Sequence, residues 1–142
     1  MTIARILHAK GRDVATIQPH RTLADAVQQL AERRIGALVV AGADGKVVGI
    51  LSERDIVRAL ALGAQVLNDP VSRYMTSKVV TCTRDMLLVD AMEEMTSGRF
   101  RHLPVVEEGR LAGIISIGDV VKFRLQEIQH ETQALREYIT TA

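Results

Sequence analysis

A long segment of this chain occurs twice, because residues 16–57 recur about half a chain length further on. Asp25 and Asp90 stand 65 positions apart, and after a hairpin the shift falls to 64, as between Asp55 and Asp119. A repeat of this size is too small to bury its own apolar face, so two copies are expected to pack on each other. The duplication therefore predicts two half-cores within 142 residues, with two related clefts between them.

The repeated unit has the pattern strand, helix, strand, strand, helix. In the first copy the apolar runs predict strands at 14–17, 36–41 and 47–51, and helices at 22–34 and 52–62. The second copy predicts strands at 79–83, 101–106 and 111–115, a helix at 88–96, and a last helix from residue 116. Asp44-Gly45 and Glu108-Gly109 favour the two hairpin turns. The expected fold class is α/β (α+β).

The segments outside the repeat predict further helices. Residues 68–75 predict one short helix with Pro70 in its first turn, and they resemble residues 2–7 ahead of the first copy. We divide the chain into 1–66 (repeat 1 with its lead-in helix), 67–125 (repeat 2 with a linker helix) and 126–142 (a helical extension). The last helix carries a seam at alternating steps of four and three, formed by Val121, Leu125, Ile128, Thr132, Leu135 and Ile139. Such a helix either folds back on its own subunit or pairs with a symmetry mate.

Composition excludes several classes of function. The formal charge is +1 and only 3% of residues are aromatic, with no Trp, so neither a nucleic-acid surface nor an anionic membrane surface is favoured. No signal peptide or apolar run of about 20 residues is present, which predicts a cytoplasmic location. The single cysteine, Cys82, is expected to be buried and inert. No metal-ligand cluster or nucleophile–base pair appears, so we expect no metal and no catalytic residues.

A Ser-x-x-Asp motif recurs at the start of the last helix of each copy, as Ser52 with Asp55 and Ser116 with Asp119. Free N–H groups in a first helical turn attract phosphate, and the serine hydroxyls could add a donor. The aspartates could accept hydrogen bonds from a vicinal diol such as ribose. The same motif is also a capping box, so the residues alone leave both interpretations open.

Arginines also repeat, since Arg34 and Arg99 each precede the second strand of a copy. An arginine there could bind phosphate bidentately. It could equally interact with the dipole at an exposed helix C-terminus. Arg54, Arg101 and Lys78 are further basic candidates with weaker support.

The whole pattern resembles a tandem pair of CBS domains (the Bateman module) in a stand-alone CBS domain-containing protein. The resemblance is carried by Arg-Phe-Arg-His-Leu-Pro-Val-Val at 99–106 and Gly-Ile-Ile-Ser-Ile-Gly-Asp-Val-Val at 113–121. The first copy has Arg-Ile-Gly-Ala-Leu-Val-Val at 34–40 and Gly-Ile-Leu-Ser-Glu-Arg-Asp-Ile-Val at 49–57. The resemblance implies two β-α-β-β-α units packed sheet to sheet with pseudo-twofold symmetry.

Site residues follow from the resemblance by position. It implies that Asp119 and Asp55 hold the ribose hydroxyls. Phosphate is implied to face Ser116, Ile117, Gly118, Ser52, Glu53 and Arg54, with Arg99 and Arg34 neutralising charge. Adenine is implied to meet the backbone of Arg101, His102 and Leu103, against Pro104. The lead-in chain is implied to close each cleft, through Lys10, Asp13, Thr76, Lys78 and Val79, and Ala37 lies in the first cleft.

The first copy departs from the family pattern at Val39, where the family has a proline and the second copy has Pro104. We therefore expect the Asp119 cleft to bind first. The resemblance implies a regulatory module, not an enzyme, that binds an adenosine ligand. AMP is the first choice, with ATP, ADP, NAD(H) or S-adenosylmethionine as others, and no catalytic cofactor is implied. The module would act on an unknown effector protein in trans.

We expect a homodimer whose interface includes Val121, Leu125, Ile128 and Leu135. The alternative function is a structural dimerisation or scaffold protein with vestigial clefts.

Overall fold

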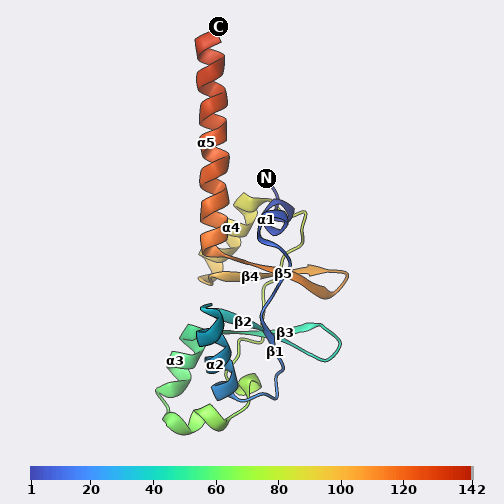
Figure 1. The fold of residues 1–142 in the computed structure, drawn as a ribbon, viewed down its shortest axis with the longest axis vertical. Helices are drawn as coiled ribbons and strands as arrows, with labels where there is room; N and C mark the ends of the chain where they lie inside the picture. The colour runs from blue at the N-terminus through green and yellow to red at the C-terminus, as the bar shows by residue number, and fades with distance from the viewer. Residues whose placement is uncertain (142) are drawn as a thin grey trace.

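The computed structural model describes residues 1–141 as two stacked repeats from which one long helix projects (Figure 1). The first repeat contains β1 (Thr16–Ile17), α2 (Leu23–Arg33), β2 (Ala37–Ala41), β3 (Val47–Ser52) and α3 (Glu53–Leu60). The second contains α4 (Leu88–Gly98), β4 (His102–Glu107), β5 (Arg110–Ser116) and α5 (Ile117–Thr141). A lead-in helix α1 (Ile3–Lys10) precedes the first repeat, and two short 3-10 helices (Ala64–Asn68 and Val71–Arg73) connect the repeats. The duplicated α/β plan is confirmed.

The two sheets face each other at the centre, and the helices cover their outer sides (Figure 1). The first sheet has the order β1-β2-β3, with β1 parallel to β2 and β2 antiparallel to β3. The second is the antiparallel pair β4-β5. Both hairpins turn where the sequence predicted: Gly45 has φ +79°, and Glu108 and Gly109 have φ +53° and +78°. In the second hairpin both central residues have positive φ, the turn geometry that matches strand twist, whereas in the Asp44-Gly45 turn Gly45 alone has it.

The strand predicted at residues 79–83 is wrong, because the structure has only an isolated parallel bridge there, between Cys82 and Val105. The reason lies in the partner strand. In the first repeat the N–H of Val39 donates to the carbonyl of Ala15 (3.1 Å) and extends the pairing beside β1. Its counterpart, Pro104, has no N–H to donate, so the pairing stops.

Two hydrophobic cores form, and each includes a segment from outside its own repeat. The second-repeat core contains Ile3, Ile6 and Leu7 of α1 besides residues of α4, β4, β5 and α5. The first-repeat core contains Val66 and Val71 of the connecting segment. All five side chains are at most 2% exposed. The lead-in helix of the first repeat therefore packs on the second repeat, while the connecting segment packs on the first.

Equivalent glycines in the two repeats make room for the segment that packs across from the other repeat. A Cβ on Gly113 in β5 would lie 2.6 Å from Leu7 Cδ2, and a Cβ on Gly49 in β3 would lie 2.5 Å from Met75 Sδ. Neither position has room for a larger side chain. Leu7 and Met75 therefore occupy equivalent places on opposite repeats, which gives the molecule a pseudo-twofold relation.

Several predicted boundaries change. The single short helix expected at 68–75 is wrong: the 3-10 turn there covers only Val71–Arg73, with Pro70 as its N-cap. The helix predicted from residue 22 begins at Leu23, with Thr22 as its N-cap, since Thr22 Oγ1 accepts the N–H of Asp25 (3.1 Å). α3 ends at Leu60, earlier than the residue 62 expected from Gly63.

The last helix is continuous and does not fold back. Within α5 only Val120 and Phe123 are buried, and every residue from 128 to 141 is exposed. Figure 1 shows this part extending away from both repeats. The fold-back interpretation is therefore wrong, and within residues 1–141 the apolar side chains of the seam are exposed.

Candidate functional site

The two Ser-x-x-Asp motifs form reciprocal caps at the starts of α3 and α5. Asp119 Oδ2 accepts the N–H of Ser116 (2.9 Å), and Ser116 Oγ accepts the N–H of Asp119 (3.2 Å). The Ser52 and Asp55 pair repeats this arrangement at 2.9 and 3.3 Å. Within residues 1–141, Oδ1 of either aspartate accepts no hydrogen bond. Capping therefore occupies one carboxylate oxygen and leaves the other able to accept from a ligand.

The first N–H of each helix is not available to phosphate. The N–H of Ile117 donates to the carbonyl of Arg101 (2.8 Å), and that of Glu53 donates to the carbonyl of Gly36 (3.0 Å). The expectation that these two groups face phosphate is therefore wrong in this structure. The amides of Gly118 and Arg54, both on exposed residues, make no such strand contact within residues 1–141.

A lysine from the lead-in helix reaches the second motif. Lys10 Nζ lies 2.6 Å from Asp119 Oδ2 and also donates to the carbonyl of Ile114 (3.1 Å). The two ion-paired side chains are 35% and 23% exposed. The sequence placed Lys10 at the first repeat, whereas the crossing of α1 brings it to the second. Asp55 has no ion-pair partner within residues 1–141.

The environment of the second motif shifts two pKa values. Burial alone would raise the pKa of Asp119, but hydrogen bonds from Lys10 and Ser116 outweigh it and hold the pKa below its usual value. Burial, followed by the positive charge of Lys10, lowers the pKa of His102. The carboxylate is therefore ionised and the imidazole neutral at pH 7. A ribose would meet an acceptor, and a base would meet an uncharged ring.

The residues implied to meet adenine lie on β4 and beside it. His102 is partly buried and pairs with Ser116 of β5, while Leu103 and Pro104 are buried. Arg101 is exposed, and its carbonyl is already used by Ile117. The structure thus brings His102, Ser116, Asp119 and Lys10 together at one end of the β4-β5 pair.

The two repeated arginines have an unusual backbone. Arg34 is the C-cap residue that follows α2 and Arg99 the one that follows α4, with φ of +54° and +55°, in the left-handed region that non-glycine residues rarely enter. Both side chains are exposed. Both arginines follow a helix C-terminus, as the interpretation based on the helix dipole requires. Binding of phosphate by these side chains stays a prediction.

The other implied residues are placed as follows. Thr76 pairs with Ile50 of the first repeat through two backbone hydrogen bonds (3.0 and 2.9 Å), so this lead-in also crosses. Asp13, Lys78 and Arg54 are exposed, Val79 is partly buried, and Ala37 is buried opposite Ser52. Lys10 and Thr76 thus lie at the cleft of the repeat that they do not precede.

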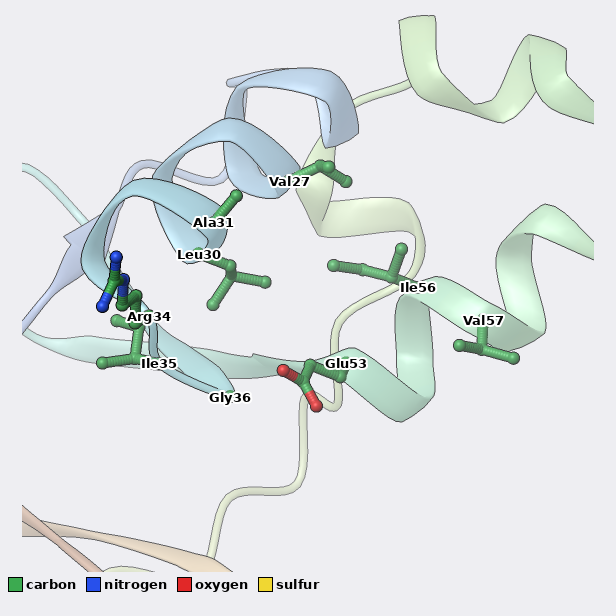
Figure 2. Close-up of a pocket in the computed structure, with 9 residues that line it drawn as sticks. All are labelled: Val27, Leu30, Ala31, Arg34, Ile35, Gly36, Glu53, Ile56 and Val57. Carbon is green, nitrogen blue, oxygen red and sulfur yellow. The ribbon is translucent and has the colours of Figure 1, made fainter.

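A surface pocket of about 600 Å³ lies elsewhere, between α2 and α3 (Figure 2). The side chains of Leu30 and Ile56 extend from the two helices toward each other, with Arg34 and Glu53 at one end. In the second repeat Phe100 and Ile117 stand where the first has Ile35 and Glu53, and both pack on the core there. This pocket was not predicted, because the sequence signals it only through that difference between the copies.

Several other predicted properties can be compared with the structure. Cys82 is 4% exposed, which confirms the buried location, and burial raises its pKa to about 12, as expected of an inert thiol. Within residues 1–141, no group of three or more His, Cys, Asp or Glu side chains is arranged to hold a metal ion. No helix in the same part of the chain is both long and apolar enough to cross a membrane.

Comparison with known families finds matches over most of the chain. The family model "CBS domain" matches residues 10–62 and 71–126. The CBS domain-containing protein CBSX3, mitochondrial, of Arabidopsis thaliana is 33% identical over 147 residues, which cover 97% of this chain and 71% of that protein. The chain spans 66% of the length of another curated relative and 19% of a longer one.

Solved structures match as well. The CBS-domain containing protein ATU1752 from Agrobacterium tumefaciens is 51% identical with a TM-score of 0.84, over 87% of this chain and 99% of that chain. The CBS domain protein PAE2072 from Pyrobaculum aerophilum, complexed with AMP, is 29% identical with a TM-score of 0.76. That match covers 84% of this chain and 89% of the other.

Proposed function

This chain belongs to the CBS domain family as a tandem pair of CBS domains, and we propose that it is a regulatory module that binds an adenosine nucleotide beside Asp119. AMP is the first candidate, because a structural relative is described in complex with AMP. The module binds and does not catalyse. A ligand between the repeats favours one arrangement of them, by no more than its difference in affinity for the two arrangements.

One observation supports this function most strongly. Around one helix start the second repeat has an ionised carboxylate with a free Oδ1, the amide of the exposed residue Gly118 and the cation of Lys10. Ribose hydroxyls can donate to the carboxylate, and a phosphate can accept from the other two groups. Charge-assisted hydrogen bonds contribute about 1.5–3 kcal/mol each. Two or three of them, with adenine burial, suffice for micromolar affinity, about −8 kcal/mol, after the entropic cost.

Isothermal titration calorimetry of the whole chain tests the proposal. We expect AMP to bind with a Kd in the micromolar range, and ATP, NADH and S-adenosylmethionine serve as competing ligands in parallel titrations. Absence of heat with all four at millimolar concentration contradicts the function. A preference for NADH over AMP keeps the nucleotide function and changes the ligand.

The alternative, a scaffold with vestigial clefts, is favoured by one observation. Capping already gives Ser116 and Asp119 a structural role, as it does for Ser52 and Asp55. The scaffold predicts that substitution of Asp119 changes helix stability and nothing else. Nucleotide binding that depends on Asp119 excludes it. The effector protein and the cytoplasmic location stay predictions.

A homodimer is part of the proposal. On α5, Val121, Leu125, Ile128 and Leu135 are 42–59% exposed and lie along one narrow stripe of the helix. Apolar residues at alternating steps of four and three are typical of a helix that packs against another helix. A second copy of the same chain supplies an identical seam, which is the requirement of a twofold interface.

Replacing Leu125 and Ile128 together with glutamate is expected to convert the dimer to a monomer, because four carboxylates would then face each other across the seam. Sedimentation velocity at high micromolar concentration measures the change. The matched control, Gln126→Glu with His130→Glu, adds the same number of carboxylates on another face of α5 and should stay dimeric. A wild-type chain that sediments as a monomer contradicts the dimer.

A further inference from the structure

Lys10 makes the two clefts different in a way that the duplication does not predict. At the second repeat its ammonium holds both Asp119 Oδ2 (2.6 Å) and the carbonyl of Ile114 (3.1 Å). At the first repeat the equivalent carbonyl, that of Ile50, accepts the backbone N–H of Thr76 (2.9 Å) instead. A side-chain contact in one cleft thus replaces a backbone contact in the other.

The counterpart of Lys10 is Lys78, because each follows by three residues the side chain that crosses an equivalent glycine, Leu7 or Met75. Lys78 is exposed and forms no ion pair within residues 1–141. The pairing of a lysine with the motif aspartate therefore belongs to the second cleft, because Lys10 is the last residue of α1 and α1 packs on the second repeat.

The ion pair between Lys10 and Asp119 affects how a ligand can bind to this carboxylate. Asp119 Oδ2 accepts from both Lys10 and the N–H of Ser116, so a ribose diol that donates to Oδ2 as well as to the free Oδ1 competes with Lys10 for Oδ2. An ammonium on a four-carbon stem can move a few ångströms to a nearby anion. Uncharged adenosine leaves the displaced ammonium without an anionic partner, with only the carbonyl of Ile114 nearby, whereas a phosphate at the start of α5 supplies an anion.

Resting on the nucleotide function above, we propose that Lys10 selects phosphorylated over uncharged adenosine ligands at the second cleft, by moving from Asp119 to the phosphate. Lys10 is in this sense a specificity residue. It also couples ligand binding to α1, whose buried side chains belong to the second-repeat core.

The test compares AMP with adenosine by calorimetry in an Asp55→Asn background, which confines ribose binding to Asp119. We expect Lys10→Met to bind adenosine up to about fivefold more tightly, the effect of a partly exposed ion pair of about 1 kcal/mol. AMP should bind no more tightly, so the AMP-to-adenosine preference falls. Lys10→Arg should keep the preference, and Lys46→Met, which removes an equal charge from the first hairpin, should leave it unchanged.

A second readout needs no ligand. The positive charge of Lys10 contributes to the low pKa of His102, so that pKa should rise in Lys10→Met when titrated by NMR. An unchanged His102 pKa, or an unchanged AMP-to-adenosine preference, overturns the inference while the nucleotide function stands. A wild-type chain that binds neither ligand overturns both.

Discussion

Replacing Asp119 with asparagine is expected to raise the Kd for AMP about 10- to 100-fold. The carboxylate would accept charge-assisted hydrogen bonds from the ribose hydroxyls, and losing the charge costs about 1.5–3 kcal/mol. Asparagine keeps a side-chain oxygen that can accept the N–H of Ser116, and the Ser116 cap itself is unchanged, so the start of α5 should remain capped. Calorimetry gives the Kd, and thermal unfolding checks that the fold is retained.

Two controls sharpen this result. Asp55→Asn removes the equivalent carboxylate from the first cleft, where Val39 replaces the proline, and should have the smaller effect on AMP binding. With 2′-deoxy-AMP as the ligand, the wild type and Asp119→Asn should differ less than with AMP. Equal AMP affinity of the wild type and a folded Asp119→Asn chain contradicts the ribose role of Asp119.

Replacing Ile6 with alanine is expected to lower the free energy of unfolding by about 2–5 kcal/mol, the usual cost of truncating a fully buried aliphatic side chain. Ile6 is 0% exposed and packs in the second-repeat core, although it precedes the first repeat in the chain. Urea unfolding measures the loss. Leu62→Ala, at a side chain that is 68% exposed, should change it by less than about 0.5 kcal/mol.

The alkylation rate of Cys82 shows which of the two cores a substitution destabilises. Cys82 belongs to the same core as Ile6 and reacts only when that core opens, because burial raises its pKa to about 12. Ile6→Ala should therefore speed alkylation of Cys82. Leu30→Ala, in the first-repeat core, should speed it less. The reverse order contradicts the assignment of α1 to the second repeat.

Local patterns in the sequence predicted most elements. The apolar runs located the hairpin strands, and Asp44-Gly45 and Glu108-Gly109 located their turns. The failure at residues 79–83 arose because a strand needs a partner, and the partner there contains Pro104. That signal was in the sequence, but it lay more than 20 residues away and mattered only once the pairing was known.

The sequence predicted which residue types form the candidate site, but not the long-range ion pair and hydrogen bonds that they make. The two Ser–Asp pairs are where the motif placed them, because capping is a contact between neighbours in the chain. The partner of Asp119 could not be predicted, since Lys10 is 109 residues away. The hydrogen bonds that occupy the amides of Ile117 and Glu53 were missed for the same reason.

Two copies of one α/β unit, the positions of their hairpin turns and the helix starts that carry a serine and an aspartate can all be read in the amino-acid sequence. Each of these features follows from residues within a few positions of one another. Which lead-in segment packs on which repeat, and therefore which cleft receives Lys10, is visible only in the three-dimensional fold. The apolar side chains of α1 could be buried by either copy, and the choice depends on three-dimensional packing, as where Leu7 crosses Gly113.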